Sequence, residues 1–390
     1  MSAPLRVLHV VRGLANSSGT THIVLPLSEE QARQGARVCV MYVEKPPQPS
    51  VEPDPSLVES RCFGQTLPLD NPGISLDFAR AIDRRIAEFD VVHVHAVWNF
   101  PTWWTMRAAR RAGVPYMVAP QGSFEPWALG QNRWGKRVYG GLTEIPLLRR
   151  ATWLQALTTA EAAQFRRTGL EAPSVIVPNG IDPRMFDRPA PPLAQRFGLP
   201  EGARTLLFLS RLHPKKGLDV LAEAFARLVA TRPEVTLVVA GHDAGSGYGD
   251  EFRSMIARHG IEARCRLLGE VKGADKFEIL LGADAFVLPS RSEGLPVAAI
   301  EAMGAGLPVV ITPGCNLPEV AEEGAGLVVP LEPEALAGAL EEVFANPARA
   351  REMGMRGRRL VRERFAWEVI ARQLLGIYSG TTTGRSEVRA

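Results

Sequence analysis

The sequence lacks several features that mark common classes of protein. Its four cysteines are widely spaced and form no CxxC pair, which argues against a structural zinc site or a disulfide framework and favours a reducing cytoplasm. No apolar run reaches the length of about 18 residues that spans a membrane. The 45 basic and 42 acidic residues nearly cancel, so no overall field indicates binding to nucleic acid.

What the chain does contain is a repeated alternation of short β-branched runs with segments of helical period. We expect strands at residues 5–11, 36–43, 90–97, 114–120, 152–158 and 174–179, and again at 204–210, 235–241, 264–269, 283–290, 307–312 and 325–330. This alternation is typical of parallel sheets with crossover helices. The 390 residues, 46% of them hydrophobic, are enough for two cores, so we predict an α/β protein of two domains.

Composition also indicates where the domains meet. Residues 182–202 are rich in proline and poor in apolar periodicity, which is typical of an interdomain segment. We therefore expect a first domain at 1–187, a linker at 188–202 and a second domain at 203–365. The last eleven residues, 380–390, are small and polar and predict a disordered tail.

Ligands of such sheets bind beyond the carboxyl ends of the strands, so the loops there are the first place to seek chemistry. After the strand at 204–210 comes "RLHPKKG", and a helix of apolar period follows it. Arg211 and Lys216 thus lie near the positive end of a helix dipole, which favours a phosphate ligand. The alternative is a pair of solvated surface cations.

A second loop follows the strand at 283–290 and contains "SEGLPVAAIEAM". Pro296 suits the first turn of a helix, which leaves Glu293, Gly294 and Leu295 in the loop before it. Glu301 lies among apolar residues of that helix, where a carboxylate needs a partner, and the hydroxyls of a sugar or ribose are suitable ones. The alternative is a dipole-favoured Glu293 and an ordinary exposed helix face at Glu301.

Loops of the first half carry weaker signals. Residues 12–24 form a loop of small residues that enters a helix and can bring backbone close to a ligand. Gln121 and Gly122 follow the strand at 114–120, in a loop that would suit a sugar. His93 and His95 share one face of a strand, and a metal site is a minor alternative there, so we assign no metal ligand.

Taken together, three segments resemble a known family. "PNGID" at Pro178–Asp182, "SRLHPKKG" at Ser210–Gly217 and "PSRSEGLPVAAIEAMGAGLPVV" at Pro289–Val310 look like the motifs of the family 4 retaining glycosyltransferases, with two glutamates in the E-x7-E arrangement. The resemblance runs over nearly the whole chain. It implies a GT-B fold, in which two Rossmann-like domains face a central cleft and a C-terminal helix, here 366–379, crosses back to the first domain.

The resemblance also implies roles for individual residues. The donor is a nucleotide-diphosphate sugar, bound by the second domain, and no further cofactor is implied. Arg211 and Lys216 would stabilise the departing diphosphate without a divalent metal, and Glu293 would hold the transferred sugar. The donor-binding residues implied are Glu301, Gly294, Leu295, Leu268 and Gly19. The residues implied for the sugar or acceptor are Gln121, Gly122 and His95.

One departure from the family pattern concerns the loop after the strand at 114–120. Many members have His-Gly there, whereas this chain has Gln121-Gly122, and an amide cannot act as a base. We expect hydrogen bonding from Gln121 and a leaving phosphate that itself accepts the proton of the acceptor. The leading hypothesis is a hexosyltransferase of polysaccharide, O-antigen or exopolysaccharide assembly. The alternatives are a nucleotide-sugar 2-epimerase of similar fold and a glycan- or nucleotide-binding protein without turnover.

The composition of residues 101–150 suggests an acceptor that is charged and lies at a lipid bilayer. It carries eight basic residues and only two acidic ones. The basic residues are Arg107, Arg110, Arg111, Arg133, Lys136, Arg137, Arg149 and Arg150, and the acidic residues are Glu125 and Glu144. It also carries Trp103, Trp104, Trp127 and Trp134. Cations interleaved with tryptophan suit an anionic membrane surface, so a glycan or lipid-linked acceptor and a cytoplasmic location with peripheral membrane contact are expected. The alternative is solvated helix faces with tryptophans in the core.

Overall fold

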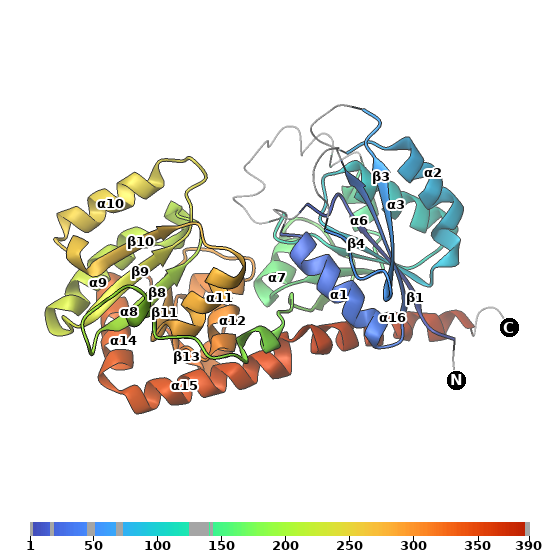
Figure 1. Ribbon diagram of the computed structural model, residues 1–390. Helices are drawn as coiled ribbons and strands as arrows, with labels where there is room; N and C mark the ends of the chain where they lie inside the picture. The colour runs from blue at the N-terminus through green and yellow to red at the C-terminus, as the bar shows by residue number, and fades with distance from the viewer. Residues whose placement is uncertain are drawn as a thin grey trace. The chain divides into compact units, whose positions relative to one another are not determined.

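The structure is a computed structural model, and it describes residues 3–15, 19–44, 51–67, 73–124, 140 and 143–386, with side chains up to 380. The chain forms two compact units (Figure 1). The first unit is Met1–Gly180 with Trp367–Ala390, and the second is Ile181–Ala366. Each unit is an α/β fold with its own sheet, so the expected fold class is confirmed.

The first unit is built on a seven-stranded parallel sheet of order β3-β2-β1-β4-β5-β6-β7. Its strands are β1 Arg6–Val11, β2 Arg37–Glu44, β3 Val58–Gly64, β4 Val91–His95, β5 Tyr116–Ala119, β6 Trp153–Ala156 and β7 Ser174–Ile176. The strand order reverses between β1 and β4, and this is where ligands bind in such sheets.

Helices cover both faces of this sheet, as the alternation along β1 requires. Leu8 and Val10 point to one core cluster, and Val7 and Val11 point to another. The first cluster lies under α2 and α3, and the second under α1 and α16. The helices are α1 Thr21–Arg33, α2 Leu76–Arg85, the 3-10 turn η1 Ile86–Glu88, α3 Phe100–Ala112, α6 Ile145–Leu148, α7 Thr159–Arg167 and α16 Trp367–Ser386.

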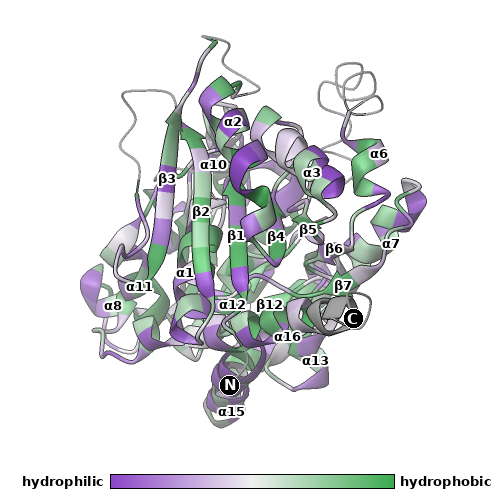
Figure 2. Cartoon of the chain, turned by 90° about the vertical axis from the view of Figure 1, so that its right-hand side faces the viewer, coloured by the Kyte–Doolittle hydropathy of each residue, from purple (hydrophilic) through white to green (hydrophobic). Residues whose placement is uncertain are grey.

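The strand β3 is the one strand of the described sheet that the sequence did not predict. It pairs with β2 on one side only, and most of its side chains are exposed or half-buried. Figure 2 shows hydrophilic stretches along β3, whereas β2 beside it is mostly hydrophobic. An edge strand of this kind has no continuous apolar run to reveal it.

The second unit is built on a six-stranded parallel sheet of order β10-β9-β8-β11-β12-β13. Its strands are β8 Arg204–Leu209, β9 Val235–Ala240, β10 Cys265–Gly269, β11 Ala285–Leu288, β12 Val309–Ile311 and β13 Gly326–Val328. Its helices are α8 Leu193–Arg196, α9 Leu218–Thr231, α10 Tyr248–Arg258, α11 Gly273–Gly282, α12 Val297–Ala305, α13 Glu319–Glu322, α14 Pro333–Ala345 and α15 Pro347–Leu360. Short turns complete it: η3 Pro183–Phe186, η4 Pro214–Lys216, η5 Glu262–Arg264, η6 Pro313–Cys315 and the π-helical η7 Val361–Phe365. One core joins these elements.

Two expectations about segment boundaries differ from the structure. The expected linker 188–202 belongs to the compact second unit, because the Leu193 side chain is 1% exposed within its core and Pro191 packs against Gly282. The expected tail begins inside α16, which continues to Ser386. This helix belongs to the first unit and runs alongside α1 (Figure 1), and its Trp367 packs on Gly180.

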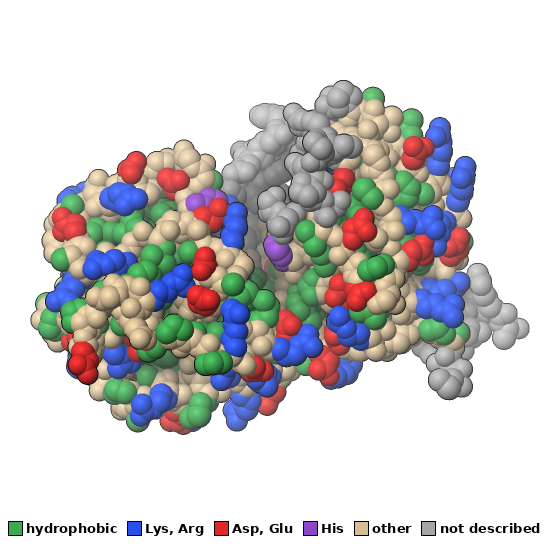
Figure 3. All heavy atoms as spheres, viewed as in Figure 1, with side chains coloured by type: hydrophobic (Ala, Val, Ile, Leu, Met, Phe, Trp, Pro, Cys, Tyr) green, Lys and Arg blue, Asp and Glu red, His purple; other side chains and the backbone are tan. Residues whose placement is uncertain are grey.

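The distribution of charge on the surface and the character of the helices can be compared with the sequence-based expectations. Basic and acidic side chains are interspersed over the face that Figure 3 shows, which agrees with the near-neutral charge of the chain. Among the helices of the described residues, none combines the length and the apolar character that crossing a bilayer requires.

Candidate active site

The candidate site of the second unit lies where its strand order reverses, at the carboxyl ends of β8 and β11. These two strands are neighbours in the sheet, and the loops that follow them touch. The backbone N–H of Arg291 donates to the carbonyl of Lys215 (2.8 Å), and the Arg291 guanidinium bonds both the Pro214 carbonyl and Asp219. The predicted residues of both loops are therefore held against each other.

Lys216 and Glu293 form the centre of this arrangement. The Lys216 ammonium lies 2.6 Å from Oε1 of Glu293, and each residue is only 9% exposed. Ser290 donates its hydroxyl to the same oxygen (2.5 Å), and Asn316 donates to the Glu293 carbonyl (2.6 Å). A buried charge needs such partners. The sequence predicted both charged residues, and the structure shows that they pair with each other.

Gly217 allows this close approach of the two loops. Its backbone is left-handed, with φ +69°, and an added Cβ would lie 2.0 Å from the Pro289 carbonyl oxygen. Glycine is the residue that meets both conditions without strain. The close contact with Pro289, just after β11, thus requires glycine directly after Lys216.

Glu301 also has a partner, which sequence reasoning missed. Its Oε1 lies 2.6 Å from the ammonium of Lys276 on α11, and the two side chains are 12% and 28% exposed. The Glu301–Lys276 pair is consistent with the expectation that this carboxylate requires a partner. Lys276 is 25 positions away on another helix, and only the packing of α11 on α12 brings it close.

The remaining predicted residues of the second unit line the same edge of the sheet. Arg211 is exposed in the loop after β8, and its side chain makes no hydrogen bond to the part of the chain that the structure describes. Leu268 is the extra residue of a bulge in β10, where the register with β9 shifts. The Glu293 N–H donates to the Gly314 carbonyl (2.7 Å), whereas those of Gly294 and Leu295 have no partner among the described residues.

In the first unit, Gln121 and Gly122 form a strained loop after β5. Both have left-handed backbones, with φ +55° and +75°. The Gln121 amide exchanges hydrogen bonds with that of Asn179 (2.9 and 3.3 Å), and the Gly122 N–H donates to the buried carboxylate of Glu161 (2.7 Å). The same carboxylate accepts from the Leu157 N–H (2.7 Å). Asn179 and Glu161 were not predicted, and they tie this loop to the ends of β6 and β7.

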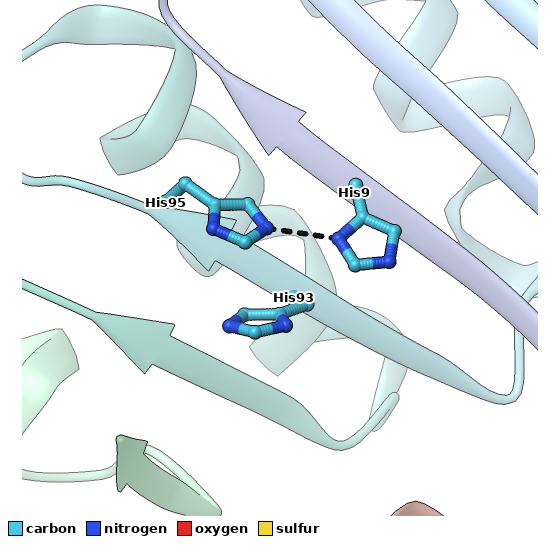
Figure 4. Close-up of side chains that lie close together, drawn as sticks. All are labelled: His9, His93 and His95. Atoms are coloured by element: carbon cyan, nitrogen blue, oxygen red, sulfur yellow. Dashed lines mark hydrogen bonds between the residues drawn. The ribbon is translucent and has the colours of Figure 1, made fainter. Parts of the chain in front are cut away.

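His95 lies at the end of β4 and belongs to a buried cluster with His9 and His93 (Figure 4). Its Nε2 lies 2.8 Å from Nδ1 of His9, which is on β1. Burial lowers the pKa of His9 to about 4 and lowers those of His93 and His95 well below the usual value. These rings are neutral near pH 7, and His95 is enclosed rather than exposed to a ligand from solvent.

Gly19 precedes α1, and an added Cβ there would meet no atom of the described residues within 4 Å. Packing among those residues therefore does not require glycine at this position. A backbone that a ligand approaches closely is a different reason for glycine, and that role stays a prediction.

The basic, tryptophan-rich segment is described only in part. Trp103 and Trp104 of α3 are half-buried and pack against the core of the first unit, and the Arg107 guanidinium lies 4.9 Å from the Trp104 ring. This favours the core alternative for these two tryptophans. Trp127, Trp134, Arg133, Lys136, Arg137 and Glu125 lie outside the described residues.

Glu144, counted above among the charges of this segment, is fully buried. It accepts hydrogen bonds from the N–H groups of Trp98 (2.7 Å) and Asn99 (3.0 Å), in a loop where Ala96 and Trp98 have positive φ. Burial nevertheless raises the pKa of its carboxyl to about 7. The side chain thus organises the loop between β4 and α3.

We predict that Glu144 makes stability fall as pH rises. A carboxyl with a folded pKa of about 7 and an unfolded value near 4.5 binds more protons in the folded state between these values, so stability is present below this window and is lost through it. The contribution is at most roughly 3 kcal/mol. Urea unfolding at several pH values should show this slope, and Glu144→Gln should remove it. An unchanged slope in the variant would contradict the assignment.

Comparisons with known proteins agree with the two units. Residues 191–360 match the family model for glycosyl transferases group 1, and residues 18–180 match the model for the glycosyl transferase 4-like domain. Each match falls in one of the two sheet-containing units described above.

Individual relatives match over nearly the whole chain. A phosphatidyl-myo-inositol mannosyltransferase of Mycobacterium leprae is 28% identical over 393 residues, 95% of each chain. A D-inositol 3-phosphate glycosyltransferase of Saccharomonospora viridis is 30% identical over 392 residues, which covers 94% of this chain and 90% of the relative. Among solved structures, HepE from Anabaena in complex with UDP has a TM-score of 0.75 at 19% identity, covering 96% of this chain and 100% of that one.

Proposed function

Because this chain belongs to the group 1, family 4 glycosyltransferases of GT-B fold, we propose that it moves a hexose from a nucleotide-diphosphate sugar, UDP- or GDP-linked, with retention of anomeric configuration. The acceptor is a glycan or a lipid-linked saccharide. The observation that carries this proposal is the buried Lys216–Glu293 pair at the switch point of the second sheet. It sets a fixed cation and a fixed carboxylate side by side, where such sheets bind ligands.

In the proposed reaction, the bond between the sugar and the diphosphate breaks and charge builds on the departing phosphate. Lys216 and the exposed Arg211 supply positive charge there. Fixed cations of this kind stabilise a leaving group without reorganising during the reaction, so the proposed transfer requires no divalent metal. Lys216 is well suited to this task because Glu293 holds its ammonium in place.

The carboxylates of Glu293 and Glu301 bind different parts of the donor. Glu293 accepts hydrogen bonds from the hydroxyls of the transferred sugar, beside the N–H groups of Gly294 and Leu295, which have no partner among the described residues. Glu301 accepts from the ribose hydroxyls, and Lys276 orients that carboxylate. The bulged Leu268 lies at the strand end proposed for the nucleobase.

The proton of the acceptor needs a base, and we assign it to the leaving phosphate itself. Attack then occurs on the same face that the diphosphate leaves, which preserves the anomeric configuration. The amide of Gln121 cannot serve as base, and its bonds to Asn179 support a role in shaping the acceptor loop. The names of the two relatives, which specify phosphatidyl-myo-inositol and inositol 3-phosphate, support an acceptor that offers hydroxyls near a phosphate.

The test begins with the donor. We expect one of UDP, GDP, ADP or dTDP to raise the melting temperature of the purified protein by several degrees, since a ligand that binds only the folded state stabilises it. Glu301→Ala should lose this shift, because the ribose partner is gone. Glu278→Ala is the matched control, as this exposed glutamate on α11 pairs with Arg196 rather than with a proposed ligand group.

The second step of the test is turnover. The protein is incubated with the nucleotide sugar that matches the stabilising nucleotide, and release of free nucleotide is measured with and without polyol-phosphate or lipid-linked acceptors. Release that depends on acceptor supports the transferase and excludes a binding protein without turnover. A stabilising nucleotide without any release from its sugar, across the acceptor panel, would contradict the proposal.

A further inference from the structure

The three histidines of the first unit form a compact buried cluster that the proposed transfer does not use. His9 is on β1, and His93 and His95 are on the neighbouring β4, with His9 and His93 directly paired in register. All three are at most 1% exposed. Figure 4 shows the rings gathered on one face of the sheet, and one ring nitrogen from each can be chosen so that all three lie within 4.8 Å.

Hydrogen bonds fix the proton positions of two rings. Nε2 of His9 lies 2.8 Å from Oε1 of Gln31, an acceptor, so His9 carries its proton on Nε2 and leaves Nδ1 bare. The contact between that Nδ1 and Nε2 of His95 (2.8 Å) then needs the His95 proton. Gln31 thus orients His9 as outer partners orient metal-binding histidines elsewhere.

Several polar atoms of the cluster have no partner. Nε2 of His93, Nδ1 of His95 and Nε2 of Gln31 are buried and make no hydrogen bond to the described residues. Leaving one such atom unsatisfied costs about 1–3 kcal/mol, and three in one place call for an explanation. Two of the three are imidazole nitrogens, the kind of atom with which histidine binds a metal.

We propose that His9, His93 and His95 bind a transition-metal ion, namely Zn²⁺, within the first unit. Neutral imidazole nitrogen is a preferred zinc ligand, and three histidines are a known complete protein ligand set for this ion. Zinc–nitrogen bonds of about 2.0–2.1 Å at tetrahedral angles place the ligand atoms roughly 3.4 Å apart. The nitrogens now lie within 4.8 Å of one another, and binding requires ring rotation that opens the 2.8 Å contact between His9 and His95.

Tyr378 is an outer partner of the proposed site. Its hydroxyl lies 2.7 Å from Nδ1 of His93, and the side chain is fully buried on α16. Through this hydrogen bond the phenol orients the His93 ring and leaves Nε2 of His93 as the nitrogen that faces the ion. The ion then joins β1, β4 and α16, so zinc stabilises the contact between the terminal helix and the sheet.

The experiment uses the full chain without a histidine tag, expressed and refolded with Zn²⁺. We expect about one zinc per chain by elemental analysis, and visible d–d bands of tetrahedral geometry when Co²⁺ replaces it. Saturating zinc should raise the melting temperature by about 5–10 °C. Tyr378→Phe should weaken zinc binding by about 10- to 100-fold, as loss of an outer partner does.

The controls match the variants closely. Tyr116→Phe removes another buried hydroxyl of the same unit, one that bonds the Leu147 carbonyl, and His22→Asn removes an exposed histidine of α1. Both should bind zinc like the wild type, whereas His95→Asn should not. Wild-type protein that retains no zinc and gives no cobalt bands after refolding would overturn the site, and this measurement does not depend on whether His95→Asn folds. Equal binding by wild type and a folded His95→Asn would overturn it too.

Discussion

Replacement of Lys216 by methionine is expected to slow glycosyl transfer by about a hundredfold to a thousandfold, the usual loss when one fixed donor to a developing negative charge is removed. Methionine retains most of the buried stem and removes only the ammonium that lies 2.6 Å from Glu293. The effect should appear in kcat, because the charge on the departing phosphate develops in the transition state. Steady-state release of free nucleotide measures it.

Loss of activity must be separated from loss of folding, because Lys216→Met leaves Glu293 buried without its cation. Breaking a buried pair in this way costs about 3–5 kcal/mol. The double variant with Glu293→Gln has no unpaired charge, so it should regain much of the stability and none of the activity. Lys215→Ala, one position away, is the matched control for charge and should transfer normally. Wild-type kcat in Lys216→Met would contradict the assignment to the leaving group.

The second large effect is expected from Gly217→Ala, which should destabilise the second unit by roughly 2–5 kcal/mol. Two costs add in this variant: alanine in a left-handed backbone costs roughly 1–2 kcal/mol, and its Cβ would lie 2.0 Å from the Pro289 carbonyl oxygen. Backbone on both sides must move to relieve the contact. Chemical denaturation measures the loss, and nucleotide stabilisation should disappear with it.

Gly260→Ala separates the two costs. Gly260 has φ +68°, almost the value at Gly217, and an added Cβ there would meet no atom of the part of the chain that the structure describes within 4 Å. This control should therefore cost only the backbone term, about 1–2 kcal/mol. Equal losses in the two variants would show that the approach of Gly217 to Pro289 is not needed for stability.

The strands show what sequence patterns reveal and what they hide. All twelve predicted strands are present, because strands of a parallel sheet are buried on both faces and appear as short apolar runs. β3 was missed because it is an exposed edge with alternating charges. The expected linker was assigned from proline content, yet Leu193 within it is buried, since prolines also occur in turns that pack tightly on a core.

For the candidate site, the sequence predicted the charged residues but not their partners. Glu293 and Lys216 were found because each follows a strand, and such loops meet at the switch point. Lys276, Asn179 and His9 were missed, since each reaches its partner from a distant element. A rule could have found His9: β1 and β4 are neighbours in this fold, so residues at matching depths on them lie side by side.

The placement of α16 has a consequence for how the protein is made on the ribosome. Val7, Val24 and Leu27 of the first unit pack in one cluster with Ile370 and Leu374 of α16, yet the whole second unit is synthesised between them. At about 5–20 residues per second, the apolar face under α16 stays uncovered for roughly 10–40 seconds of translation. The first unit is thus the first to be synthesised and the last to be completed, and during that interval a chaperone has an exposed hydrophobic surface to bind.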